Sequence, residues 1–174
     1  MRSRWLAFIA VILALGVAAC SGPQVKEFGR EDAQQITKFV GSFTAVYNSH
    51  DAAKMLDFYA GAAVLMPPNA STVRGPESIQ GYYQNRFVTD GATDLIIEPK
   101  DISGQGPLAY MIGTFSLKLK HPDGTEGRDR GKILFILRSL AKNWRIEYSM
   151  WSSDLPPVVP PASEPAEAAA KPKK

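Results

Sequence analysis

The apolar residues in the first half of the chain recur at helical spacing. In residues 30–48 they lie three and four positions apart, which places one apolar stripe along a helix. Asp51 follows this stretch, and its carboxylate can cap a second, short helix because it accepts unpaired backbone N–H groups of the next turn. A third helix is predicted to begin at Pro76, where the missing N–H of proline costs nothing. This half of the chain therefore predicts three helices.

A short buried strand is predicted between the second and third helices, in the stretch "AVLMPPN" (residues 63–69). Four consecutive apolar residues are typical of a strand that is buried on both faces. Pro67 and Pro68 cannot donate hydrogen bonds to a neighbouring strand, so the strand is expected to end at Met66. The prolines are interpreted as structural, because they stop the strand and turn the chain towards the third helix.

Beyond residue 90 the pattern changes to strict alternation, which predicts three or four strands joined by glycine-bearing turns. Their approximate ranges are 93–102, 108–120, 131–140 and 143–152. The last strand is predicted to place one set of residues on the core face, namely Trp144, Ile146, Tyr148 and Met150. Helices followed by a meandering sheet indicate an α+β fold with an antiparallel sheet.

The chain begins with the pattern of a secretory signal. Arg2 and Arg4 precede an apolar run over residues 5–15, which is followed by small residues. A charged head, a short apolar stretch and small residues at a cleavage point predict a signal peptide over residues 1–19. The protein is therefore expected to be exported.

Cys20, the single cysteine of the chain, follows directly after "VAA". The four residues "VAAC" resemble the lipobox of bacterial lipoproteins, in which the cysteine becomes the lipidated first residue of the mature chain. An ordinary cleaved signal that happens to contain a cysteine is the alternative. Lipidation would attach the protein to a membrane without spanning it. Because Ser21 follows, the resemblance implies the outer membrane, facing the periplasm, in a Gram-negative host.

Composition divides the remaining chain into a tether, a body and a tail. Residues 20–29 contain a Gly-Pro breaker and solvated charges, and residues 156–174 are rich in Pro, Ala and Lys, which predicts a disordered tail. The formal net charge of +3 comes from the ends, because fourteen Lys and Arg balance fourteen Asp and Glu in residues 30–154. A neutral body without a recognisable reading module argues against nucleic-acid binding.

Three stretches of the body carry a resemblance to a known family: "NSHD", "VRGPESI" and "WRIEYSMWSSD". With these motifs the chain resembles the SnoaL-like, nuclear-transport-factor-like superfamily over residues 30–155. The resemblance implies a curved antiparallel sheet wrapped around about three helices, a cone-shaped, cystatin-like roll. It also implies a pocket between sheet and helices, and dimerisation through the outer face of the sheet. The superfamily includes ketosteroid isomerase, polyketide cyclases and non-catalytic modules, so the fold does not settle the function.

The catalytic groups of ketosteroid isomerase are not found at the matching positions. Alignment from "NSHD" places the catalytic base of the isomerase at Pro67 and its oxyanion tyrosine at Phe43. The strand that would carry the third group, a protonated carboxylic acid, reads "GKILFILRSL" and contains no Asp or Glu. Enolisation needs a positioned base and acidic donors at the developing oxyanion, so isomerase chemistry is not expected.

Aromatic and methionine side chains supply the candidate pocket, together with a carboxylate at its rim. The candidate residues are Tyr59, Met66, Tyr83, Phe135, Tyr148, Met150, Trp151 and Asp154. Such a lining suits a small hydrophobic ligand held without catalysis. Simple packing of the core is the alternative for most of these side chains.

The remaining polar residues predict no metal or cofactor site. His50 and His121 fall in turns and are interpreted as solvated, with no repeated ligand spacing nearby. The charged run over residues 128–132 is interpreted as a solvated strand start, with anion binding at the pocket mouth as the alternative. Three functions stay open: a tethered binding module, an isomerase, cyclase or hydrolase with non-standard pocket residues, and a dimeric assembly module of the cell envelope.

Overall fold

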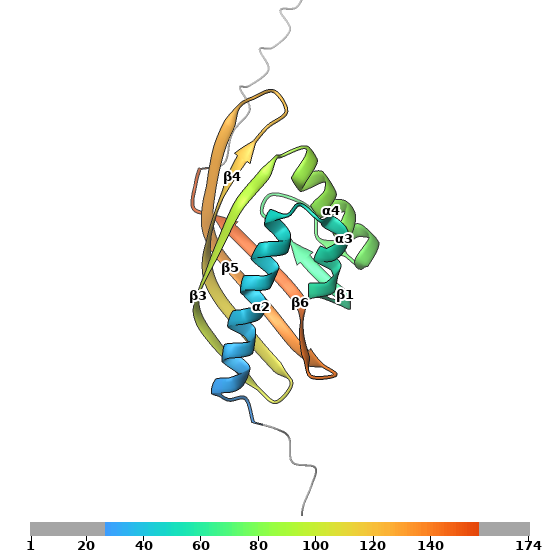
Figure 1. Ribbon diagram of the computed structural model, residues 1–174, viewed down its shortest axis with the longest axis vertical. Coiled ribbons are helices and arrows are strands. Elements are labelled where there is room, and N and C mark those ends of the chain that lie inside the picture. Colours follow the sequence, from blue (N-terminus) through green and yellow to red (C-terminus); the bar gives the residue numbers. More distant parts are fainter. Residues whose placement is uncertain (1–26, 157–174) are drawn as a thin grey trace, which may run out of the picture.

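The structure is a computed structural model that describes residues 27–156 (Figure 1). The expected signal peptide, Cys20 and nearly all of the expected tail lie outside the described residues. Within the described part, none of the helices is long and apolar enough to cross a membrane.

The helices form where the apolar pattern predicts them. Helix α2 (Arg30–Asn48) turns its buried residues inward at spacings of three and four, and the Asp32 carboxylate accepts a hydrogen bond from the Gly29 N–H at its start. Helix α3 (Ala52–Met55) is capped by Asp51, which accepts from the Lys54 N–H at 3.0 Å. A 3-10 turn (Leu56–Phe58) follows, and helix α4 (Pro76–Val88) has its proline in the first turn. The three predicted helices are confirmed.

Six strands form one curved sheet on one side of the helices (Figure 1). Their order is β2-β1-β6-β5-β4-β3. The strands are β1 (Tyr59–Met66), β2 (Val73–Arg74), β3 (Ala92–Gln105), β4 (Leu108–Lys120), β5 (Glu126–Leu140) and β6 (Asn143–Ser153). The α+β fold with a curved sheet is confirmed.

One strand pair differs from the fully antiparallel sheet that the alternation predicts. Strand β1 runs parallel to β6, while the other neighbouring pairs are antiparallel. Parallel neighbours need a long connection, and here α4 and the β3–β5 meander lie between the two strands in the chain. The sheet is therefore mixed.

Strand β6 also departs from strict alternation, because it contains a bulge. Leu137 of β5 pairs with Ile146, but Ile136 pairs with Tyr148, so Glu147 is an extra residue in β6. Beyond the bulge the faces are exchanged: Ser149 is 2 % exposed, whereas Tyr148 and Met150 are 46 % and 45 % exposed. The prediction that Tyr148 and Met150 share the core face with Trp144 and Ile146 is wrong.

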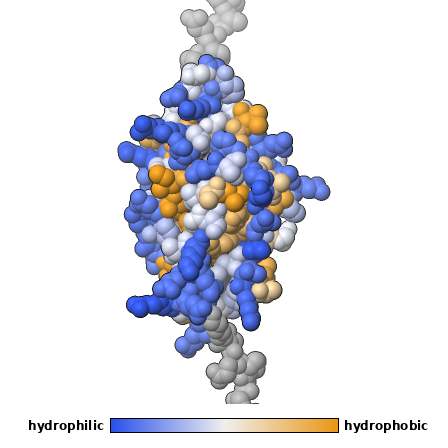
Figure 2. All heavy atoms as spheres, viewed as in Figure 1, coloured by the Kyte–Doolittle hydropathy of each residue, from blue (hydrophilic) through white to orange (hydrophobic). Residues whose placement is uncertain are grey.

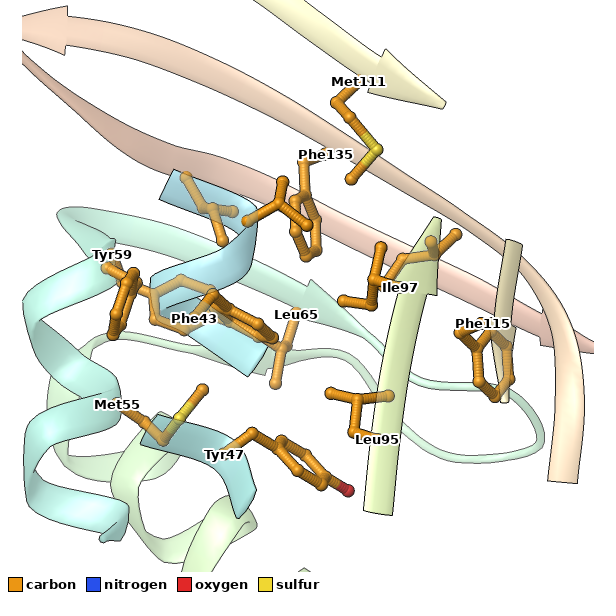
Figure 3. Packing of buried hydrophobic residues seen from close by; sticks show 14 of the residues in the cluster. Phe43, Tyr47, Met55, Tyr59, Leu65, Leu95, Ile97, Met111, Phe115 and Phe135 are labelled. Carbon is orange, nitrogen blue, oxygen red and sulfur yellow. The ribbon is translucent and has the colours of Figure 1, made fainter. Parts of the chain in front are cut away.

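The core lies between the inner face of the sheet and the buried faces of α2 and α4. Aromatic rings meet in its centre, where Phe43 packs edge to face on Phe58 and at a tilt on Phe135. Methionines lie around them (Figure 3). On the opposite side of α2 the exposed residues are mostly polar, and hydrophilic side chains cover much of that face of the molecule (Figure 2). The two hollows described below lie at the Asn48 end of this core.

Candidate functional site

A narrow cavity lies between α2, α4 and the inner face of the sheet. Its volume is about 40 Å³, and its walls are mostly aromatic and aliphatic. The lining residues are Phe43, Tyr47, Tyr82, Tyr83, Arg86, Leu95, Phe115, Leu117, Ile133, Phe135, Ser149 and Trp151. One water-sized sphere needs roughly 10–15 Å³, so the cavity has room for a few waters or one small chemical group.

Buried hydroxyls meet on one side of this cavity. The Tyr59 and Tyr83 hydroxyls are 2.5 Å apart, and Tyr59 also makes a side-chain hydrogen bond with Ser149. The β6 bulge turns Ser149 inward and so completes this chain of three hydroxyls. Burial raises the pKa of both tyrosines above the ordinary value, so both phenols keep their protons at neutral pH.

Arg86 brings a positive charge into the otherwise uncharged wall of the cavity. Its Nη1 donates to Asp90 Oδ2 at 2.7 Å, one helical turn along, and its side chain also hydrogen-bonds Tyr47. Burial disfavours the charged guanidinium, but Tyr47 and Asp90 outweigh it and raise the pKa of Arg86 above its ordinary value. Burial likewise raises the pKa of Tyr47. Arg86 is therefore a permanent cation beside a protonated phenol.

A larger groove adjoins the cavity, and Leu95 and Leu117 line both hollows. The groove volume is about 820 Å³. Its remaining lining residues are Asn48, Asp94, Ile96, Ser116, Lys118, Arg128, Asp129, Arg130 and Leu155. Because the hollows share two walls, we treat them as one site with a narrow inner chamber and a wide outer groove.

Two polar contacts hold the walls of the groove in place. The Asn48 side chain accepts from the Leu95 N–H at 2.7 Å and donates to the Leu95 carbonyl at 2.9 Å, which ties the end of α2 to β3. Ser153 donates to Asp129 at 2.6 Å and ties the end of β6 to β5. The groove is thus lined by strands whose spacing is set by side-chain hydrogen bonds as well as by the sheet.

The structure brings together only some of the candidate residues chosen from the sequence. Tyr83, Phe135 and Trp151 line the inner chamber, and Tyr59 reaches it through the Tyr83 hydroxyl. The remaining four lie elsewhere. Tyr148 and Met150 point outward after the bulge. Met66 is the last residue of β1 and pairs with Met150 of β6. Asp154 follows β6 and forms an ion pair with Lys132.

Four polar residues of the chamber are absent from the set predicted from the sequence: Tyr47, Tyr82, Arg86 and Ser149. Tyr47 belongs to the buried stripe of α2 and also ends that stripe, which brings it to the chamber (Figure 3). Arg86 lies four residues after Tyr82, and on a helix that spacing puts both on one face. The spacing from Tyr82 could therefore have predicted Arg86 as a chamber residue. The inward position of Ser149 depends on the bulge in β6.

Neither histidine lies in the chamber or the groove lining. His50 is exposed in the turn after α2, with its ring 5.1 Å from that of Phe87, and His121 begins the β4–β5 turn. Within residues 27–156, no group of three or more His, Cys, Asp and Glu side chains is arranged to hold a metal ion.

Comparison with known proteins gives a likeness of fold. No protein-family model matches the chain, and no curated protein matches it. Among solved structures, a ketosteroid isomerase-like protein from Erwinia carotovora atroseptica superposes with a TM-score of 0.67 at 20% identity, covering 74% of this chain and 100% of that one. A nuclear transport factor 2-like superfamily protein from Salmonella enterica serovar Typhimurium gives 0.63 at 17% identity, covering 79% and 96%.

A third match names the fold itself. An NTF2-like protein with a cystatin-like fold from Novosphingobium aromaticivorans gives a TM-score of 0.59 at 17% identity, covering 70% of this chain and 80% of that one. The resemblance seen in the sequence is confirmed at the level of the fold: the chain has the cystatin-like fold of NTF2-like and ketosteroid isomerase-like proteins. Proteins of one fold carry out different functions, so the function must be argued from the site.

Proposed function

We propose that the protein is an exported, lipid-anchored domain that binds a small molecule with an apolar body in the inner chamber and outer groove, without catalysis. The observation that carries this proposal is the pair of adjoining hollows, an aromatic chamber and a wide groove, which share Leu95 and Leu117 as lining residues. Lipid attachment rests on the "VAAC" stretch at Cys20.

The sizes of the two hollows indicate the shape of the ligand. Sites for drug-sized molecules usually measure about 300–1,000 Å³, so the chamber of about 40 Å³ is too small to hold one, whereas the groove of about 820 Å³ is large enough. The ligand therefore places a narrow end in the chamber and its body in the groove. Aliphatic side chains of the groove, including Ile96 and Leu155, offer apolar contacts to that body.

The chemistry of the chamber supports binding rather than proton transfer. The hydroxyls of Tyr47, Tyr59 and Tyr83 are protonated at neutral pH, as phenols ordinarily are, and burial raises their pKa further, so they serve as hydrogen-bond donors and not as bases. The positions that match catalytic groups of the isomerase are occupied by Phe43 and Pro67. A binding site with a few oriented donors is the function that these groups support best.

Native mass spectrometry of the full chain, extracted from its own host in mild detergent, tests this proposal. We expect a retained small molecule with the wild-type chain. Leu117→Phe, which fills the shared wall, should abolish retention. Ile112→Phe makes a similar enlargement on the outer face of the same strand, where the side chain is 46% exposed, and should retain the ligand. If the wild-type chain retains nothing and a panel of lipids and metabolites raises no melting temperature, the binding proposal is refuted.

The same preparation tests the lipid anchor. The intact mass of the mature chain should show acyl groups on Cys20, and Cys20→Ser should lose them. An intact mass without acyl groups would refute the anchor while leaving the pocket proposal standing, because the two rest on different parts of the chain.

A second candidate function, assembly through a second copy of the chain, is favoured by the outer face of the sheet. Register places two rows of apolar side chains across β4, β5 and β6: Ile112, Leu134 and Met150, then Tyr110, Ile136 and Tyr148. Three of these are large and exposed, namely Ile112, Tyr148 and Met150. The superfamily resemblance implies dimerisation through this face. Light scattering should show a dimer that Tyr148→Lys converts to a monomer, and a monomeric wild-type chain would rule out this role.

A further inference from the structure

We propose that the ligand carries a carboxylate at its narrow end, and that Arg86 binds this carboxylate inside the inner chamber. This inference rests on the proposed function and adds the chemical class of the ligand: a monocarboxylate with an apolar body. Three features of the chamber support it, namely the position of its charge, the free donors around that charge, and its shape.

Arg86 supplies the charge of the chamber. Among the described residues that line the chamber, it is the one with an ionic side chain, and that side chain is 17% exposed. Its partner Asp90 is not part of the lining and is 35% exposed. The chamber therefore meets the cation, while the compensating carboxylate lies outside it. In a site of low polarity such a cation favours an anionic group over a neutral one of the same size.

The guanidinium has donors to spare. A guanidinium carries five N–H donors in a plane. Among the residues that the structure describes, its hydrogen-bond partners are Asp90 and the Tyr47 hydroxyl. Further donors remain for a ligand. Asp90 and Tyr47 also fix the side chain in place, so little conformational freedom is lost when an anion binds.

Neighbouring phenols can join the same anion. Tyr47 lines the chamber, and its hydroxyl points away from Phe43 (Figure 3). Tyr83 lines the chamber and shares a hydrogen bond with Tyr59. Tyr47 accepts from Arg86 and keeps its own O–H for the ligand, and Tyr83 keeps its O–H when Tyr59 is the donor in their shared hydrogen bond. A cation and protonated hydroxyls in one small space form a site for an oxyanion.

The size of the chamber favours a carboxylate over bulkier anions. A carboxylate is flat and matches the planar fork of the guanidinium with two parallel hydrogen bonds. Phosphate and sulfate groups are tetrahedral and need more room than a flat group in a chamber of about 40 Å³. The apolar body then extends past Leu95 and Leu117 into the groove.

Two probes with the same carbon skeleton test this inference: 4-phenylbutanoate and 4-phenylbutan-1-ol. Calorimetric titration into the full chain in lipid nanodiscs, corrected with empty nanodiscs, measures both affinities. We expect the acid to bind about tenfold more tightly than the alcohol, or better, as a charged hydrogen bond typically allows. In Arg86→Met this preference should disappear, and in Arg86→Lys it should survive in weaker form, because lysine keeps the charge but not the planar fork.

Two control variants distinguish direct anion binding by Arg86 from general attraction to positive charge and from a structural role of Arg86. Lys120→Met removes a cation that lies on β4 two residues beyond the groove lining, and the preference for the acid should persist if it does not come from general attraction. Asp90→Asn leaves Arg86 in place but removes its carboxylate partner, so acid binding should be kept or strengthened. If Asp90→Asn loses acid binding as completely as Arg86→Met, Arg86 has a merely structural role and the inference is refuted.

The outcomes also separate the inference from the proposed function. Equal affinity of wild type for acid and alcohol, with both abolished by Leu117→Phe, would refute the carboxylate and leave the binding site standing. A wild-type chain that binds neither probe and retains no molecule from its host would refute both. Circular dichroism and melting temperature of each variant show that it is folded before its affinity is compared.

Discussion

The three buried hydroxyls of Tyr59, Tyr83 and Ser149 allow a quantitative test of the chamber. Tyr59 is the middle member, because it contacts both others. Tyr59→Phe leaves two hydroxyls without this partner, whereas Tyr83→Phe leaves Tyr59 still bonded to Ser149. A buried polar group that loses its partner costs about 1–3 kcal/mol. The middle substitution should therefore be the more damaging of the two.

The magnitudes follow from the same contacts. Tyr83 and Ser149 line the chamber, which has room for water, and water can replace part of the lost hydrogen bonding. We therefore expect Tyr59→Phe to lower the free energy of unfolding by about 1–2 kcal/mol, the lower end of that range. Tyr83→Phe should cost about 0.5–1.5 kcal/mol, the usual net value of one hydrogen bond. The double variant should cost less than the sum of the two, because the second substitution removes a hydroxyl that the first had already left unpaired.

Urea unfolding of the full chain, followed by tryptophan fluorescence, measures these differences. With a typical slope of about 1–3 kcal/mol per molar urea, a loss of 1–2 kcal/mol moves the midpoint by several tenths of a molar or more. Trp144 is buried and Trp151 lies against Tyr82, so the signal reports on both the core and the chamber. Strictly additive single and double variants, or a Tyr83→Phe cost equal to that of Tyr59→Phe, would show that the hydroxyls are not coupled in this order.

Two further predictions concern the sheet and the phenols. Gly131→Ala would place a Cβ 1.8 Å from the Ser152 carbonyl oxygen, so it should lower the free energy of unfolding in urea by about 1–3 kcal/mol. In the control variant Gly127→Ala the new Cβ would lie 3.6 Å from the nearest atom, so the change should stay within about 0.5 kcal/mol. Equal effects of the two variants would contradict the β5–β6 register. The raised pKa of the buried tyrosines means that the unfolded chain loses these protons first, so their contribution to stability is complete below pH 10.0 and declines above it. Unfolding midpoints that do not fall as pH rises past 10 would contradict that burial.

Most of the fold could be predicted from local sequence patterns. The helix from Arg30 to Asn48, the Asp51 cap and the proline start of α4 each depend on neighbouring residues, so they could be read from the chain one segment at a time. The parallel pairing of β1 with β6 depends instead on contacts between segments far apart in the chain. The alternation of apolar and polar residues within one strand does not indicate whether the neighbouring strand runs parallel or antiparallel to it.

The site was harder to predict for a related reason. One extra residue, Glu147, exchanges the faces of the rest of β6, and it was not visible in the alternation because Tyr148 and Met150 continue the apolar pattern beyond it. The bulge places Glu147 on the outer face, where it pairs with Arg138 (Nη2 to Oε2, 3.0 Å). The alternation that puts Tyr148 and Met150 on the core face puts Ser149 between them on the opposite face, whereas in the structure Ser149 is buried and lines the chamber. Pocket residues on β6 could not be assigned without the register of its partner strand.

The direction of α2 has a consequence for where the groove lies. This helix of 19 residues spans roughly 28 Å, and it separates the entry of the chain at Gly29 from Asn48, which lines the groove. The described chain begins at one end of the long axis, where α2 starts (Figure 1). For a chain anchored through Cys20, as proposed above, we expect α2 to set the groove roughly its own length away from the point where the folded body begins.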